Sequence, residues 1–225
     1  MAVEFLGRGK FASCYKIEDN KVIKIYENLK TTSIIDMRMV GIENDTYVFP
    51  IDVKKAYENI IVAIIMEYVN SKNLSDTNWK ISDIIESVDK VYFDTDLLSD
   101  MKIETKDIHF KNILYNGMIK IIDTDFYTFV DENNNKLKSI NIANFNQAFS
   151  NGILLGFSDK KIVQQIIFTD ELLELVSIMI SDSQDNRILK EFLIALKKRL
   201  EKEVDYEVND YQSIKDSIKQ ITRVK

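Results

Sequence analysis

Apolar and polar residues alternate through the first part of the chain, which is the pattern of half-buried strands. Strands are predicted at Glu4–Leu6 and Cys14–Ile17, on either side of a glycine-bearing turn, and at Lys21–Tyr26 after a polar turn. Two more are predicted at Tyr47–Lys54 and Ile60–Tyr68. Short strands joined by turns indicate a small antiparallel sheet.

The pattern becomes helical in the second part of the chain. A short helix is already predicted at Thr31–Val40, and from Asn70 onward helical spacing of apolar residues dominates, first between Ile81 and Tyr92. Further helices are predicted at Ile142–Phe157, Glu171–Ile180, Asn186–Lys202 and Tyr211–Ile221. The chain is therefore expected to be α+β, with a strand-rich part followed by a mainly helical part.

One hairpin is predicted within the helical part. Two short apolar strands, Asn112–Tyr115 and Met118–Ile122, flank Asn116–Gly117, and an Asn-Gly pair in this context is a strong hairpin signal. Farther along, the polar segment Asp131–Lys138 reads as a hairpin or loop, and the apolar stripe Ile188–Leu200 reads as core.

The composition is that of a soluble globular protein, with 45% apolar and 29% charged residues in 225 positions. No apolar run is long enough to cross a bilayer, and the amino terminus lacks a secretory pattern. The single cysteine, Cys14, excludes an internal disulfide, so a reducing, cytoplasmic location is expected. The lone histidine, His109, leaves little material for a zinc site or a catalytic triad. A net charge of −6 without a basic tail argues against nucleic-acid binding.

Two features of the first part suit phosphate binding. Gly7 and Gly9 stand close together within the hairpin run Leu6–Phe11, and glycines let backbone N–H groups approach phosphate oxygens. An ordinary hairpin is the commoner origin of such a run. Lys24 lies in the apolar strand Val22–Ile25, where it could reach phosphates from a cleft or could be an edge-strand lysine with its ammonium group in water.

Further polar residues surround the predicted hairpin of the second part. Asp107 and Asn112 are five positions apart before its first strand, and Asp123 ends its second strand. In their order, the glycine hairpin, the strand lysine Lys24, the Asp107–Asn112 segment and Asp123 resemble the protein-kinase superfamily. The resemblance covers roughly the first 125 residues, and the rest is similar only in being helical.

The resemblance implies a bilobal protein-kinase-like fold, with a small antiparallel-sheet N-lobe at residues 1–69 and a compact, mainly helical C-lobe at residues 70–225. It implies that Lys24 pairs with the α- and β-phosphates of ATP. Asp107 would orient the acceptor hydroxyl and accept its proton, while Asn112 and Asp123 would hold Mg²⁺.

The resemblance also implies where ATP lies. Backbone of the glycine hairpin would cover the phosphates, apolar residues of both lobes would enclose adenine, and backbone of the segment after the last sheet strand would bond to its edge. Lys111 could approach the γ-phosphate or point into solvent. The residues implied to surround ATP are Leu6, Gly7, Gly9, Phe11, Cys14, Val22, Lys24, Met66, Glu67, Val69, Leu114 and Ile122.

Several positions depart from the family pattern. Ala12 replaces the third glycine, and no His-Arg pair precedes Asp107. His109 is similar to a variant found in aminoglycoside phosphotransferases, although a structural role is preferred for this residue. Thr124 and Asp125 stand in place of a Phe-Gly pair, and Asp125 is either a second magnesium ligand or a turn residue, with the turn preferred.

Two supporting roles also have alternatives. The acid that should pair with Lys24 is not obvious; Asp36, in the predicted helix, is preferred over Glu43, which lies beyond the expected helix end. Asn141 or Asn144 could brace the catalytic loop, but a helix-cap or surface role is preferred for both.

The expected function is therefore an ATP- and Mg²⁺-dependent phosphotransferase. Its acceptor is expected to be a hydroxyl group, with Ser or Thr on a protein preferred over a small molecule of the aminoglycoside-phosphotransferase type. The alternative of another class is a nucleotide-binding pseudokinase that acts as a binding module. No nucleic-acid partner and no membrane span are expected, and the helical part could offer a surface to a protein partner.

Overall fold

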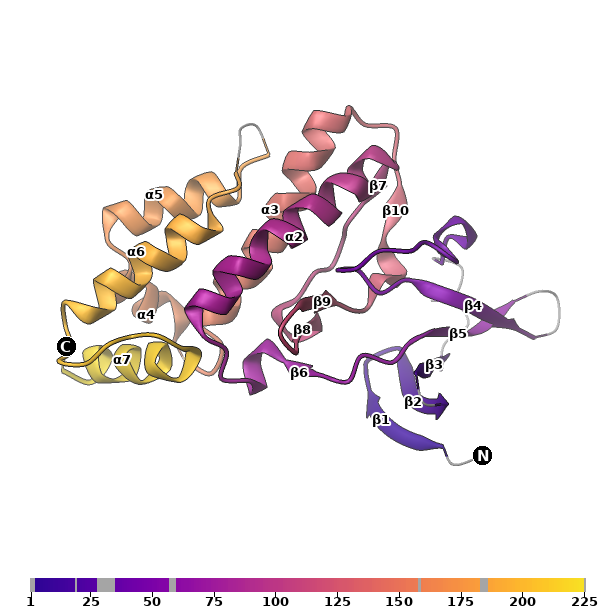
Figure 1. The fold of residues 1–225 in the computed structure, drawn as a ribbon, viewed down its shortest axis with the longest axis horizontal. Helices are drawn as coiled ribbons and strands as arrows, with labels where there is room; N and C mark the ends of the chain where they lie inside the picture. The colour runs from indigo at the N-terminus through magenta and orange to yellow at the C-terminus, as the bar shows by residue number, and fades with distance from the viewer. Residues whose placement is uncertain are drawn as a thin grey trace.

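The computed structural model describes residues 3–18, 20–27, 35–56, 60–157, 159–182 and 186–224. It confirms an α+β chain in which the strands of the first part form one sheet and the second part is mainly helical. The sheet lies at one end of an elongated molecule, and the carboxyl-terminal helices lie at the other (Figure 1). The layout has two parts.

Five antiparallel strands form the main sheet, in the order β1-β2-β3-β5-β4. Their bounds are β1 Glu4–Arg8, β2 Ala12–Glu18, β3 Lys21–Tyr26, β4 Pro50–Lys55 and β5 Ile61–Glu67. Val22 and Tyr26 of β3 are buried, and Lys24 shares their face because side chains alternate along a strand. Since β3 lies inside the sheet, Lys24 is not an edge-strand lysine.

Two predicted elements of this part differ from the structure. The fourth strand begins at Pro50 rather than at Tyr47, because the Tyr47 ring is buried in the core of the helical part and its backbone forms an isolated parallel bridge with Ile121. The helix predicted at 31–40 is reduced, within residues 35–40, to a turn of 3₁₀ helix at Met37–Met39. Residues 31–34 lie outside the described residues.

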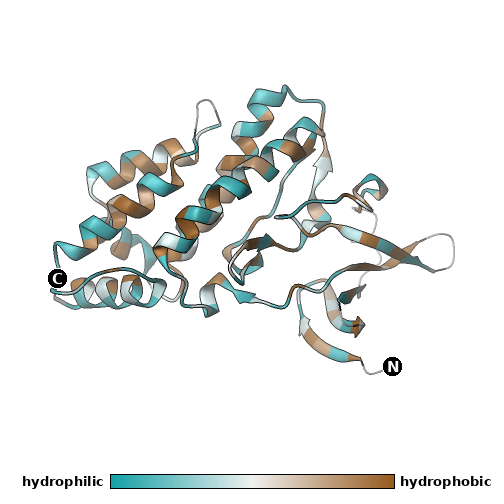
Figure 2. Cartoon of the chain, in the orientation of Figure 1, coloured by the Kyte–Doolittle hydropathy of each residue, from teal (hydrophilic) through white to brown (hydrophobic). Residues whose placement is uncertain are grey.

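Six α-helices dominate the described residues of the second part: α2 Ile81–Asp100, α3 Asn134–Ile153, α4 Lys160–Ile167, α5 Asp170–Met179, α6 Leu189–Glu201 and α7 Tyr211–Val224. Apolar and polar residues alternate in short segments along these helices, as expected for helices with one buried side (Figure 2). The apolar stripe along α6 is buried, with Ile188 just before the helix partly buried, which confirms that the stripe is core.

Two of these helices depart from the sequence expectation. Helix α3 begins at Asn134, inside the segment expected to be a hairpin or loop. It begins there because the Asn133 side chain accepts hydrogen bonds from the first turn and because Leu137 is buried. Helix α4 was not predicted. The Asp159 side chain caps it by accepting a hydrogen bond from the backbone N–H of Ile162. In both cases a single cap and a few buried residues decide the helix.

Short strands lie between the sheet and the helices. β6 Lys72–Asn73, β8 Ile113–Tyr115 and β9 Ile119–Ile121 form one small sheet, and β7 Ile103–Glu104 pairs with β10 Thr128–Phe129. Gly117 has a φ of +102°, which suits the predicted Asn-Gly turn. The backbone of Ile121 exchanges hydrogen bonds with Thr46 and Val48, at 2.7 and 2.9 Å, and thereby ties the segment before the main sheet to the hairpin.

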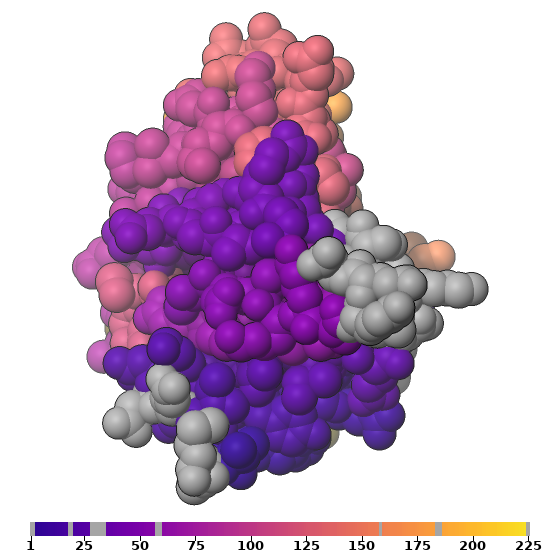
Figure 3. Space-filling model, turned by 90° about the vertical axis from the view of Figure 1, so that its right-hand side faces the viewer, coloured from indigo at the N-terminus to yellow at the C-terminus, as the bar shows by residue number. Residues whose placement is uncertain are grey.

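The two parts of the chain are stacked. Seen from the side of the sheet, the indigo and purple residues of the first part fill the near face, and the pink residues of the helical part rise beyond it (Figure 3).

No helix in the described ranges combines the length and the apolar character that crossing a bilayer requires.

Candidate functional site

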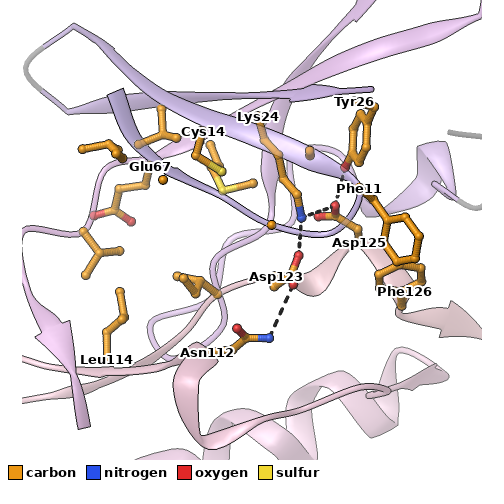
Figure 4. Close-up of a pocket in the computed structure, with 18 of the residues that line it drawn as sticks. Phe11, Cys14, Lys24, Tyr26, Glu67, Asn112, Leu114, Asp123, Asp125 and Phe126 are labelled. Atoms are coloured by element: carbon orange, nitrogen blue, oxygen red, sulfur yellow. Dashed lines mark hydrogen bonds and ion pairs between the residues drawn. The ribbon is translucent and has the colours of Figure 1, made fainter. Parts of the chain in front are cut away.

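A cleft of about 590 Å³ lies between the main sheet and the short strands and loops of the helical part (Figure 4). This volume is typical of small-molecule sites, which span about 300–1,000 Å³. Every residue that the sequence assigned to ATP, magnesium or catalysis lines the cleft: Leu6, Gly7, Gly9, Phe11, Cys14, Val22, Lys24, Met66, Glu67, Val69, Asp107, Asn112, Leu114, Ile122 and Asp123. The fold thus gathers residues that are far apart in the sequence around one space.

The glycine hairpin between β1 and β2 covers one wall of the cleft. A Cβ at Gly7 would meet no atom within 4 Å, and one at Gly9 would meet only the Ala12 carbonyl oxygen, at 3.7 Å. Packing within the protein therefore does not require these glycines. What they do is keep side chains away from the backbone that faces the cleft.

One end of the cleft is apolar. Val22 of β3 pairs with Met66 of β5, and Leu114 and Ile122 face them from the helical part. Burial raises the pKa of the Cys14 thiol, with Asp123 and Asp125 adding to the rise and Lys24 opposing it, so Cys14 stays neutral in this wall. A flat, uncharged ring would fit such a space.

The other end carries charge. The Lys24 ammonium group is hydrogen-bonded to Asp123 and lies 2.6 Å from Oδ2 of Asp125 (Figure 4). Burial alone would lower the pKa of Lys24, but the negative charges of Asp125 and Asp123 outweigh it and raise the pKa above its usual value. The lysine is therefore a fixed positive charge at this end of the cleft.

Asp125 is the more deeply placed of the two carboxylates. Its side chain is 4% exposed, against 32% for Asp123, and the Tyr26 hydroxyl donates a hydrogen bond to it. Burial raises the pKa of the Asp125 carboxyl, an effect that Lys24 and Tyr26 oppose. The residue lies in the 3₁₀ turn Thr124–Phe126, as expected of a turn residue, but its carboxylate is also the buried partner of Lys24.

The preference for Asp36 as the partner of Lys24 is wrong. The Asp36 carboxylate accepts hydrogen bonds from the Arg38 side chain at 3.0 and 3.1 Å, whereas the Lys24 ammonium group pairs with Asp123 and Asp125. Glu43, the other choice, is exposed. Since the sequence from Asn28 to Ile34 contains no acid, Asp125 takes the place of the expected helix carboxylate.

The loop between β7 and β8 supplies the remaining polar groups. Asp107 and Asp123 both line the cleft and both have left-handed backbones, with φ of +57° and +67°. Such conformations are strained for residues other than glycine and gather at functional sites. Oδ1 of Asp107 lies 2.6 Å from Nε2 of His109, and both side chains are largely exposed.

Two asparagines of α3 hold the start of this loop. Oδ1 of Asn141 accepts from the backbone N–H of Thr105 at 2.8 Å, while its Nδ2 donates to Ser99 Oγ and to the Ile103 carbonyl. Nδ2 of Asn144 donates to the Thr105 carbonyl at 2.6 Å. The preferred helix-cap or surface role was therefore wrong for both, and they brace the loop, because tertiary packing turns this face of α3 inward.

The loop also rests on Gly152 of α3. A Cβ at this position would lie 2.0 Å from two ring carbons of Phe110, whose ring is buried and packs against Phe149 at 5.7 Å between centroids. Replacing Gly152 by alanine is expected to lower the free energy of unfolding by about 1–3 kcal/mol, because the added methyl group would overlap the Phe110 ring and force it to shift. Denaturant unfolding measures this change.

The exposed neighbour Asn151 provides the matched control for Gly152. Asn151→Ala is expected to change the free energy of unfolding by less than about 0.5 kcal/mol. Equal unfolding midpoints for Gly152→Ala and the unsubstituted protein would contradict the close contact with Phe110.

A metal ion would find a modest set of ligands here. Within the described ranges, no cluster of three or more His, Cys, Asp or Glu side chains is arranged to hold one. The Asn112 amide lies 3.4 Å from Oδ2 of Asp123, so an amide oxygen and a carboxylate can meet at one point once the amide is turned. This set fits Mg²⁺, which commonly takes one or two protein oxygens and completes its shell with phosphate and water.

Comparison with known proteins adds no relative: no protein-family model matches the chain, and no curated protein matches it.

Some residues of the cleft were not predicted from the sequence. They include Tyr26, whose hydroxyl donates to Asp125, and Phe126, whose ring meets that of Phe11 edge-on at 6.4 Å at the charged end of the cleft. The position of Tyr26 two residues after Lys24 was a usable signal, since residues i and i+2 of a strand share a face. No local sequence pattern predicts that Phe126 lines the cleft.

Proposed function

We propose that the protein is an ATP- and Mg²⁺-dependent phosphotransferase with a protein-kinase-like fold, which moves the γ-phosphoryl group of ATP to a hydroxyl group, with Ser or Thr of a protein as the preferred acceptor. The observation that carries the proposal is the meeting of Lys24, Asn112 and Asp123 with a glycine hairpin around one cleft that Asp107 also lines. The apolar end of the cleft suits the base of a nucleotide, and the charged end suits its phosphates.

Binding of ATP follows from these environments. The adenine ring would lie between Val22 and Leu114, at the apolar end. The phosphates would lie under the backbone of the glycine hairpin and beside the ammonium group of Lys24, which Asp125 holds in place. Phosphate oxygens would then replace Asp123 as the second partner of Lys24 and free that carboxylate.

Transfer requires a proton acceptor and stabilisation of charge. The acceptor hydroxyl oxygen attacks the γ-phosphorus, the bond from phosphorus to the β–γ bridging oxygen breaks, and ADP leaves, while the hydroxyl proton passes to the Asp107 carboxylate. Lys24 stabilises negative charge on the departing phosphates. Asn112 and Asp123 would hold Mg²⁺, which when bound neutralises charge on the phosphate oxygens.

A second candidate function is a nucleotide-binding module without transfer activity. The observation that favours it is the direct pairing of Lys24 with Asp123, the carboxylate that would otherwise hold the metal. If that pair persists with nucleotide bound, ATP would bind without magnesium-dependent chemistry.

The deciding experiment follows label from γ-labelled ATP with and without Mg²⁺, both to the protein itself and to acidic and basic carrier proteins. The expected result is Mg²⁺-dependent transfer that disappears in Asp107→Asn, while ATP still raises the unfolding temperature of that variant. Stabilisation by ATP without transfer would favour the binding module. Neither stabilisation nor transfer would contradict both functions.

A further inference from the structure

A second hollow, of about 380 Å³, lies on the helical side of the loop that carries Asp107. We call it the acceptor groove. Its apolar surface comes from Phe110 of the loop and from Ala148 and Gly152 of α3. Its polar rim includes His109, Lys111 and Lys160. The volume falls within the range of ligand sites, about 300–1,000 Å³.

The loop forms a wall shared by the two hollows. Its end residues Asp107 and Asn112 line the large cleft, whereas residues 108–111 between them line the acceptor groove. His109 lines the groove and lies 2.6 Å from Asp107. The groove therefore borders Asp107 through His109, on the side of the loop away from the large cleft.

The charge of the acceptor groove is opposite to that of the whole chain, whose net charge is −6. Lys111 and Lys160 are exposed, and among the described residues neither has a carboxylate partner. No Asp or Glu stands among the residues that line the groove, all of which are described. Lys111 lines this groove rather than the large cleft, so its charge is directed to the groove and not to the γ-phosphate position.

We propose that the acceptor groove binds the Ser- or Thr-containing segment of an acidic protein, with Lys111 and Lys160 facing carboxylates that flank the hydroxyl residue. The proposal rests on the proposed function, because it names the acceptor class of the same site. Charge complementarity is the argument for this occupant: two exposed lysines beside an apolar floor suit a chain segment with acidic side chains. In the reaction, the Ser or Thr oxygen forms its bond to the γ-phosphorus, ADP departs, and the proton passes to Asp107.

The test measures peptide binding directly, by fluorescence anisotropy with nucleotide-free protein. Three labelled peptides share one central Ser, flanked by Glu and Asp, by Ala, or by Lys. The acidic peptide is expected to bind at least about tenfold more tightly than the basic one at low salt, and Lys111→Glu with Lys160→Glu should remove this difference. Lys198→Glu with Lys202→Glu, which makes the same charge change on exposed residues of α6 and its end, is the matched control and should leave the difference unchanged.

Because binding is measured without ATP, its outcome is separate from that of the proposed function. Lys160→Glu alone, on an element that does not line the large cleft, should weaken acidic-peptide binding about threefold and leave stabilisation by ATP unchanged. Equal binding of the acidic and basic peptides, no binding of any peptide, or equal effects of the two charge reversals would overturn the proposal. Binding of free phosphoserine without binding of the acidic peptide would also overturn it, in favour of a small anionic acceptor.

Discussion

Replacing Asp123 by asparagine is expected to abolish Mg²⁺-dependent transfer, with a loss of at least about a thousandfold in kcat, or roughly 4 kcal/mol of transition-state stabilisation. The physical reason is that the substitution removes the charge of Asp123, which the proposed function makes a metal ligand beside Asn112. The fold should survive, because Lys24 keeps its buried partner Asp125. Steady-state kinetics against Mg²⁺ concentration measures the first effect, and thermal unfolding measures the second.

The control for this substitution is Asp52→Asn. Asp52 is an exposed acid of β4 that pairs with Lys54 on the solvent side, so its loss removes the same charge without touching the cleft. Unchanged kcat and Mg²⁺ dependence are expected for Asp52→Asn. Retention of Mg²⁺-dependent transfer by Asp123→Asn would exclude Asp123 as the metal ligand.

Replacing Asp125 by asparagine is expected to have the larger effect on stability, a loss of about 3 kcal/mol in the free energy of unfolding. Removing one partner of a buried ion pair leaves the other charge uncompensated. Such a removal lowers the free energy of unfolding by about 3–5 kcal/mol. Here Asp123 partly compensates Lys24, so the lower end is expected. In addition, Lys24 would then depend on Asp123 alone, and the Mg²⁺ concentration needed for half-maximal activity should rise.

The matched control is Asp36→Asn, which tests the alternative partner of Lys24. The Asp36–Arg38 pair is exposed and local, so its loss should change neither stability nor Mg²⁺ dependence to a measurable degree. Denaturant unfolding and Mg²⁺ titration of both variants compare the two acids directly. If Asp36→Asn were the more damaging substitution, the assignment of Asp125 as the fixed partner would be refuted.

Asp125 takes the place beside Lys24 that the sequence analysis expected an acid of the predicted helix to take. In this chain the acid that fixes Lys24 comes from the turn after β9, two residues beyond Asp123, instead of from a helix packed on the sheet. One short segment therefore supplies both the partner of the lysine and the candidate metal ligand. The position of Lys24 then depends little on the 3₁₀ turn at Met37–Met39.

Local sequence was sufficient where one physical pattern decides the structure. Alternation along Lys21–Tyr26 predicted the strand that carries Lys24, and the Asn-Gly pair predicted the hairpin of β8 and β9. Helical periodicity located α2, with its predicted start at Ile81. The residues that line the cleft were named by the resemblance of the motifs and their order to the protein-kinase superfamily, not by periodicity alone.

Local sequence failed where distant groups compete for the same residue. Asn141 and Asn144 have ordinary cap-forming or surface chemistry, and only the packing of α3 against the strand at Ile103 turns them toward the loop. Asp36 lies in the expected place for a partner of Lys24, but the nearby Arg38 captures it. Pairing choices of this kind depend on distances that no sequence spacing states.

The sequence by itself therefore determined most of the order of strands and helices and the glycine hairpin, because these follow from periodicity and turn chemistry. The set of residues that line the cleft came from the resemblance of the sequence motifs to a known superfamily. The tertiary structure alone decided that Asp125, with Tyr26, holds Lys24, and that the loop of Asp107 separates two hollows of different charge. The physical reason is that ion pairs and cavities are set by which surfaces meet on folding. Contacts between residues about a hundred positions apart, such as Lys24 and Asp125, leave no periodic trace in the chain.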